Sequence, residues 1–139
     1  MFEIYASSLT GLWLILTTVF VQALIAMVAH RSQKQYIPGI TDPSLGHESF
    51  VFRSERTFLN SLENTLPFAV MVFLAMMVGV NASWLCYAVW TYAVARLIHM
   101  VLYYVIATEK NPSPRSYFYV VGLLAMIAVI VITAMALFS

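Results

Sequence analysis

Four polar side chains that could bind a ligand recur at helical spacing between positions 53 and 63, at the start of a long apolar stretch. They are Arg53, Arg56, Asn60 and Glu63. On an α-helix, the spacings i, i+4 and i+7 put Arg56, Asn60 and Glu63 on one face. Ionisable residues in a membrane-spanning helix are costly unless they face a protein interior or a wet cavity. This pattern predicts a site for a small polar ligand that bears carboxylates and an amine.

Two further polar sets are predicted to meet this face. They are Arg96, His99 and Tyr103, which are spaced i, i+3 and i+7, and Arg115, Ser116 and Tyr119 at the start of the last apolar segment. Arg115 would lie in the first turn of a helix, where the helix dipole adds positive potential. A thiol held there would lose its proton readily, because a nearby cation and a helix N-terminus both lower a thiol pKa.

The composition indicates an integral membrane protein. Of the 139 residues, 62% are hydrophobic and 9% are charged, which is more apolar than a soluble domain. The net charge of +1 gives no electrostatic basis for nucleic-acid binding. The single Cys86 excludes a disulfide framework within the chain, and the three histidines are too scattered to suggest a metal site.

We predict one membrane domain over residues 1–139, an all-α integral membrane four-helix bundle. The four predicted transmembrane helices cover residues 6–34, 50–79, 84–107 and 114–138. Each exceeds the roughly 20 residues that cross a bilayer. Gly79 to Ser83 predicts a tight hairpin between the second and third spans, with Ser83 as the N-cap. The first apolar run is too long for a cleaved signal, so we interpret it as a span.

The cations predict the orientation in the membrane. All seven Lys and Arg residues lie in or near helix ends that face the first and third connectors. By the positive-inside rule these connectors are cytoplasmic, as is the polar site, and both termini lie on the opposite side. Arg96 would lie about 11 residues from the cytoplasmic end of its helix, roughly 16 Å deep. We expect Glu63 to be its partner, because no other acidic residue has a comparable depth.

A structural interpretation stays open for each of these residues. Arg53 and Arg56 would then be interfacial cations that hold the topology. Glu63 and Arg96 would form a buried pair without a ligand, and the histidine and tyrosines would serve packing. The convergence of all of them on one half of the bundle favours a ligand site.

Three segments resemble the MAPEG family, the membrane-associated proteins of eicosanoid and glutathione metabolism. Residues 55–68, ERTFLNSLENTLPF, resemble the family signature R-x-x-x-N-x-x-E and are most similar to its microsomal glutathione transferase branch. Residues 95–104, ARLIHMVLYY, resemble the third-helix motif, and residues 114–119, PRSYFY, resemble the start of the fourth helix. The segments occur in the family's order, and the resemblance covers most of the chain.

The resemblance implies glutathione as a cosubstrate and a homotrimer whose pockets lie between adjacent subunits. The expected glutathione-binding residues, with Arg53 added from the polar pattern, are Arg53, Arg56, Asn60, Glu63, Arg96, His99, Tyr103 and Tyr119, with Lys34 or Arg31 from the end of the first helix. The resemblance also implies that Arg115 stabilises the thiolate and that Ser116 lies beside the sulfur.

We therefore expect a membrane-bound glutathione transferase or peroxidase, whose thiolate attacks a lipophilic electrophile or hydroperoxide delivered from membrane lipid. Two alternatives stay open. One is a glutathione-dependent lipid isomerase or synthase on the same scaffold, and the other is a non-enzymatic lipid-binding membrane scaffold.

Overall fold

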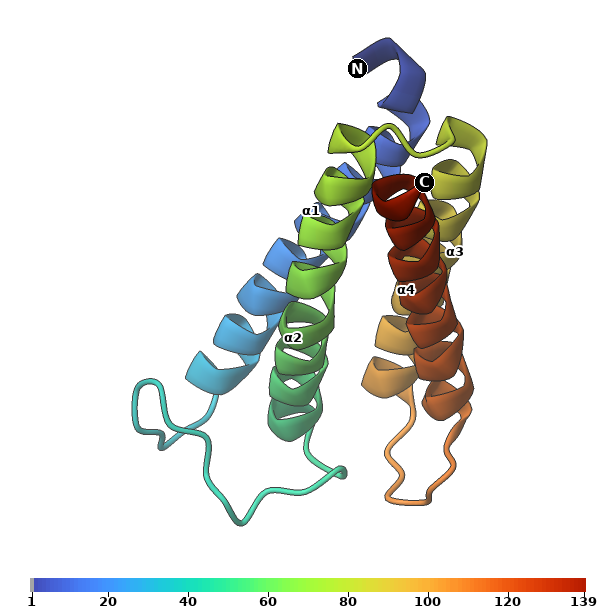
Figure 1. Ribbon diagram of the computed structural model, residues 1–139. Helices are drawn as coiled ribbons and strands as arrows, with labels where there is room; N and C mark the ends of the chain where they lie inside the picture. Colours follow the sequence, from blue (N-terminus) through green and yellow to red (C-terminus); the bar gives the residue numbers. More distant parts are fainter. Residues whose placement is uncertain (1) are drawn as a thin grey trace.

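The computed structural model describes residues 2–139 as four long helices joined by three connectors (Figure 1). The helices are α1 (Phe2–Arg31), α2 (Phe50–Met77), α3 (Ala82–Val105) and α4 (Pro114–Phe138). All four are long and apolar enough to cross a membrane. The predicted all-α architecture with four membrane-length helices is therefore confirmed. The first helix begins and ends earlier than the predicted 6–34.

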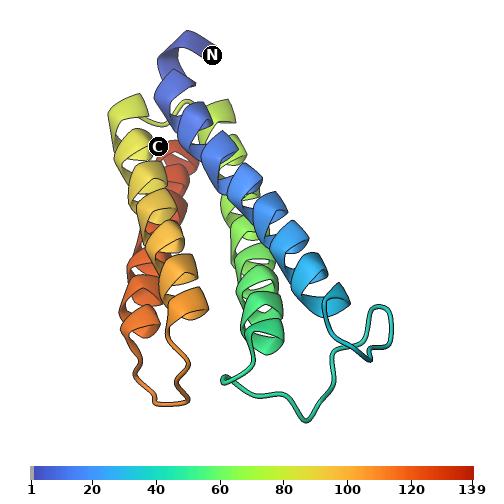
Figure 2. The ribbon, with the colours of Figure 1, turned by 180° about the vertical axis from the view of Figure 1, so that it is seen from behind.

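The two ends of the bundle differ. Both termini and the short α2–α3 connector lie at one end, and connectors 32–49 and 106–113 lie at the other (Figures 1 and 2). Helix α1 packs on α2 and α3, and α4 packs on α3 and α2. The α1–α2 and α3–α4 pairs diverge toward the end with the long connectors (Figure 2). Which end faces the cytoplasm stays a prediction.

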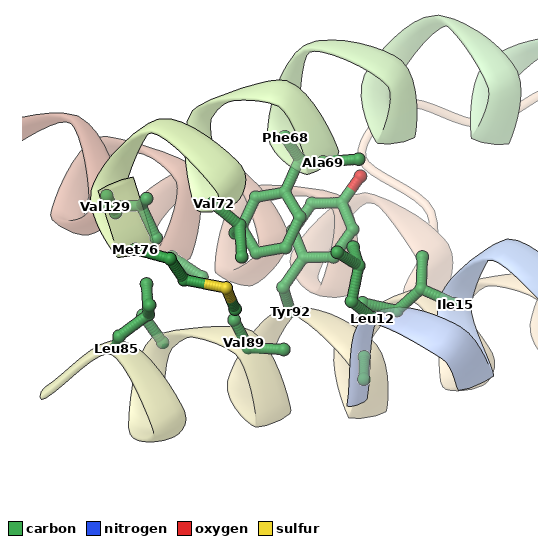
Figure 3. Packing of buried hydrophobic residues seen from close by; sticks show 14 of the residues in the cluster. Leu12, Ile15, Phe68, Ala69, Val72, Met76, Leu85, Val89, Tyr92 and Val129 are labelled. Carbon is green, nitrogen blue, oxygen red and sulfur yellow. The ribbon is translucent and has the colours of Figure 1, made fainter. Parts of the chain in front are cut away.

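The apolar core fills the half of the bundle next to the termini. Phe68 of α2 and Tyr92 of α3 stack with ring centroids 3.7 Å apart, at its centre (Figure 3). Leu12 of α1, Val89 of α3 and Val129 of α4 pack around this pair (Figure 3). Buried apolar contacts thus hold all four helices together at this end, and they leave the other half free to carry polar groups.

The hairpin between α2 and α3 ends one helix and begins the next. Gly79 has φ +76°, and Val80 N–H donates to the Ala75 carbonyl, the pattern of a Schellman motif. The Asn81 side chain then accepts from the backbone N–H groups of Ser83 and Trp84. The expected Ser83 cap is wrong, because Asn81 sits at the N-cap and Ser83 already lies within the first turn of α3.

Candidate functional site

The half of the bundle next to the long connectors has a polar interior. Its buried polar side chains are Gln22, Ser54, Thr57, Ser61, Thr65, Arg96 and His99. The Ser54 and Thr57 hydroxyls donate to backbone carbonyls of their own helix, so they cost little to bury. Arg96 and His99 cannot be satisfied in this way, and they depend on other elements.

Arg96 is 4% exposed and bonds to two residues of α2. Its Nη2 donates to Asn60 Oδ1 over 2.7 Å and to Ser61 Oγ over 3.0 Å. The expected Glu63–Arg96 pair is wrong: Glu63 is exposed and makes no ion pair within residues 2–139. Positions 61 and 63 lie about 200° apart around a helix, so they cannot both face α3. Arg96 thus has no carboxylate partner in this part of the chain.

Gln22 is a buried polar residue of α1 that the sequence does not mark as part of the site. It is 1% exposed, and its Oε1 has no hydrogen-bond partner; the same holds for Nε of Arg96. A cavity of about 10 Å³, lined by Gln22, Ser61, Thr65 and Arg96 among others, lies between α1, α2 and α3. That volume is close to what one water needs. In the sequence, Gln22 is marked only by being a strongly polar residue in an uncharged span.

A row of aromatic rings leads from His99 toward the connector end. The His99 ring lies 5.7 Å from Tyr103 and 6.4 Å from Tyr119, measured between centroids. The guanidinium of Arg115 lies over the Tyr103 ring, 4.2 Å from its centroid. The structure therefore brings together His99 and Tyr103 of α3 with Arg115 and Tyr119 of α4. The i, i+4 spacing of His99 and Tyr103 predicts that these two share a face of α3.

His47, from connector 32–49, completes this row. Its Nε2 lies 3.3 Å from the Tyr103 hydroxyl and 3.3 Å from Nη2 of Arg115. Although His47 lies in a connector, its side chain is only 22% exposed. No spacing rule marks this contact, because an irregular connector has no periodicity from which a partner can be read.

Two of the predicted site residues have structural roles. Arg53 Nη1 donates to the backbone carbonyls of His47 and Glu48, and Nη2 donates to that of Tyr104. Arg53 thereby ties the connector to the end of α3. The Ser116 hydroxyl accepts from the backbone N–H of Ser113, which caps α4.

In connector 32–49, a hydrogen bond from the Gly46 N–H holds the pKa of the Glu48 carboxyl below its usual range.

The remaining predicted residues face away from this cluster. Arg56 and Glu63 are exposed on α2. Arg31 is exposed at the end of α1, and Lys34 is exposed three residues beyond it. Position 63 lies 13 residues beyond Phe50, which is about 20 Å along the axis of α2 at 1.5 Å per residue. Within one chain the predicted site therefore divides into two groups. The interior group is Asn60, Arg96, His99, Tyr103, Arg115 and Tyr119, and the outward group is Arg31, Lys34, Arg56 and Glu63.

The interior group has an excess of positive charge. Within residues 2–139, neither Arg96 nor Arg115 makes an ion pair, and the side chain of Glu109, which lies 3.8 Å from His47, is 76% exposed. The His99 Nδ1 atom is buried without a partner. Such a group suits an anionic ligand that accepts hydrogen bonds. No cluster of three His, Cys, Asp or Glu side chains suited to a metal occurs within residues 2–139.

A separate cavity of about 530 Å³ lies between the end of α1, connector 32–49 and the start of α2. His30, Tyr36, Glu55 and Phe58 are among its lining residues. None of the interior group lines it. It is therefore distinct from the cationic cluster described above.

No curated protein and no solved structure matches the chain. The family model described as MAPEG family matches residues 7–135, which is nearly the whole sequence. Together with its four membrane-length helices, this match shows that the protein is an integral, multi-pass membrane protein of the MAPEG family.

Proposed function

We propose that this protein is a membrane-bound glutathione transferase or peroxidase. Family membership supports a function in glutathione-related or lipid metabolism in a membrane, and the proposal narrows it. The observation that carries it is buried Arg96, with half-buried Arg115 in the same polar half of the bundle, neither of which pairs with a carboxylate within residues 2–139. A buried charge without a counter-ion is costly, so an anionic ligand would stabilise this arrangement.

Glutathione has the matching chemistry, with two carboxylates, an α-amine and a thiol. Asn60, Arg96, His99, Tyr103 and Tyr119 would contact the tripeptide from the interior group. Arg56, Glu63 and Lys34 would contribute from the outward group across a subunit boundary. Glu63 is suited to the α-amine, and the cations are suited to the carboxylates.

Arg115 would hold the thiolate. It occupies the first turn of α4, where the helix dipole and its own charge both favour an anion. Each unit by which the thiol pKa falls corresponds to about 1.4 kcal/mol of stabilisation of the thiolate. The thiolate would attack an electrophilic carbon of a lipophilic substrate from the bilayer, forming a C–S bond while the leaving group departs with its electron pair.

The outward group supports contact with a neighbouring subunit, and the family resemblance implies that the assembly is a homotrimer. Glu63 and Arg56 are exposed in a single chain, although Glu63 lies about 20 Å along a membrane-length helix. A charged side chain facing lipid near the bilayer centre costs about 2.5–3.5 kcal/mol or more. A neighbouring subunit would cover these charges and share the site.

The test uses the full chain purified in detergent. We expect heat on titration with glutathione, a thiolate difference absorbance, and conjugation of chlorodinitrobenzene. Arg115→Ala should lose conjugation and the thiolate signal while its helical content is unchanged. The matched control is Lys110→Ala, which removes an exposed cation from connector 106–113, just before the start of α4.

The outcomes separate the alternatives. Heat without conjugation, but with turnover of a lipid epoxide or endoperoxide, would favour the isomerase or synthase. The absence of heat and of a thiolate signal would favour a non-enzymatic scaffold and would overturn the proposal. Unchanged turnover in Arg115→Ala would remove the thiolate role of Arg115.

A further inference from the structure

His47 contacts three parts of the chain that are distant from it in sequence. Besides Tyr103 of α3 and Arg115 of α4, its Nδ1 lies 3.8 Å from Glu109 in connector 106–113. Its ring stacks against Tyr103 at 20° between planes and meets Phe52 of α2 at an angle of 69°. Connector 32–49 is thereby joined to the cluster through one imidazole.

The partners define the protonation state of His47. A guanidinium donates hydrogen bonds and cannot accept them, so the Nε2 atom that meets Arg115 must be an acceptor. The ring proton then lies on Nδ1, on the side of the Glu109 carboxylate. The geometry thus describes a neutral imidazole with a defined tautomer.

The other charged groups around His47 are accounted for. Arg53 of α2 donates to the His47 backbone carbonyl rather than to the ring. Glu48 is the next residue, and its carboxylate accepts from the Gly46 N–H. His99 meets the ring of Tyr103 edge to face and does not bond to His47. Arg115 and Tyr103 are therefore the groups that the His47 Nε2 atom holds.

We propose that neutral His47 is a positioning residue that holds Arg115 and Tyr103 in the arrangement that binds the sulfur anion, and that protonation of His47 releases them. This inference rests on the proposed function. A protonated ring presents an N–H to the Arg115 guanidinium, so a hydrogen bond is replaced by two facing donors and two like charges. Imidazoles gain this proton in the mildly acidic range.

The sign of the effect follows from this geometry. Binding of an anion at Arg115 should be strong at neutral pH, where His47 accepts, and weaker in mild acid. If His47 were instead a direct cationic ligand, acid would strengthen binding. The two roles therefore predict opposite slopes.

The probe is glutathione sulfonate, which carries a permanent anion in place of the thiol. Its binding therefore reports on protein groups rather than on ionisation of the thiol. For the wild-type protein in detergent, we expect calorimetry to show affinity falling roughly tenfold, or about 1.4 kcal/mol, from about pH 7.5 to about pH 5.5. Tighter binding in acid, or no change, would overturn the inference.

Two variants of His47 separate positioning from packing. In His47→Gln, the amide oxygen accepts from Arg115 at every pH, so the variant should bind the probe with no pH dependence in this range. His47→Ala should bind weakly throughout. His30→Gln is the control, because His30 bonds to the Ile37 carbonyl and lies outside the cluster; it should keep the wild-type slope. A wild-type slope in His47→Gln would contradict the proposal.

A measurement without a ligand keeps the two proposals distinguishable. Nitrogen-15 NMR of histidine side chains in the full chain should show His47 protonated on Nδ1 at neutral pH, with an Nε2 resonance that moves in Arg115→Ala. If the wild type binds neither glutathione nor its sulfonate, the proposed function fails, and this spectrum still decides the role of His47. A proton on Nε2 at neutral pH would exclude it.

Discussion

The guanidinium of Arg96 on α3 donates to the side-chain oxygen of Asn60 on α2 over 2.7 Å. An amide satisfies the hydrogen bond without neutralising the charge. A carboxylate at the same place would have done both. The asparagine therefore leaves a buried cation without a counter-ion, which is the arrangement that the proposed binding role of Arg96 requires.

Substitution of Asn60 separates the fold from the site. Asn60→Ala should lower the free energy of unfolding by about 1.5–3 kcal/mol, because Arg96 loses a hydrogen bond to a charged group. Asn60→Asp should keep the contact but weaken glutathione binding, because it neutralises Arg96. Chemical denaturation and calorimetry in detergent measure the two effects.

Asn64→Ala is the matched control for both measurements, since Asn64 bonds only to the Asn60 backbone carbonyl one turn earlier. We expect it to change stability by no more than about 0.5 kcal/mol and to leave affinity unchanged. Unaltered glutathione affinity in Asn60→Asp would show that the charge of Arg96 does not serve binding.

The N-cap of α3 gives a second prediction. Asn81→Ala should destabilise the protein by about 1 kcal/mol, because the Asn81 side chain accepts from two N–H groups that are otherwise free. Ser83→Ala should change stability little, since its backbone N–H, rather than its hydroxyl, makes the cap contact. Thermal melts in detergent compare the two variants. A larger loss in Ser83→Ala would restore the cap expected from the sequence.

Hydropathy and helical spacing predict much of this fold and part of the site. Uncharged apolar runs of membrane length mark α1 and α4, and one uncharged run from Asn64 to Ala95, interrupted at Gly79, marks α2 and α3. The spacing of Arg96, His99 and Tyr103 places them on one buried face of α3. The partner of Arg96 could not be predicted, because Ser61 and Glu63 lie about 200° apart around α2 and only the packing of the helices decides which of them faces α3.

The contribution of connector 32–49 to the cluster could not be predicted from the sequence either. Its residues have no periodicity, and the position of His47 depends on the tie between Arg53 and the backbone of the connector. Within the outward group, Arg56 and Glu63 were predictable as residues that share a face of α2. That this face turns away from the chain's own α3 and α4 depends on the packing of all four helices.

The close contact of α1 with α3 depends on Gly11. A Cβ atom at this position would lie 2.8 Å from Cγ1 of Val89, a residue with no exposed surface. Gly11→Ala should therefore destabilise the protein by about 1–3 kcal/mol through overpacking. Val89→Ala removes the clashing methyl group, so the double variant should be more stable than the sum of the single effects predicts.

Gly122→Ala is the control for this prediction, because its Cβ would lie 3.6 Å from Arg96 Cδ, an ordinary contact. We expect a smaller effect there. Denaturant unfolding of the wild type, Gly11→Ala, Val89→Ala and the double variant completes the double-mutant cycle, and Gly122→Ala is measured beside them. Additive effects of Gly11→Ala and Val89→Ala would mean that the two helices adjust without a clash.

The exposed Glu63 predicts the assembly state. Native mass spectrometry from detergent should give three copies of the wild-type chain. Glu63→Lys should shift the population toward single chains and weaken glutathione binding, because it reverses a charge that the proposed subunit boundary covers. Glu3→Lys makes the same change at an exposed position at the start of α1, and it should leave both properties intact. Intact trimers with unaltered affinity in Glu63→Lys would place this carboxylate outside the subunit boundary. A wild type that is a single chain would leave a charge facing lipid about 20 Å along α2, and the shared site would have to be abandoned.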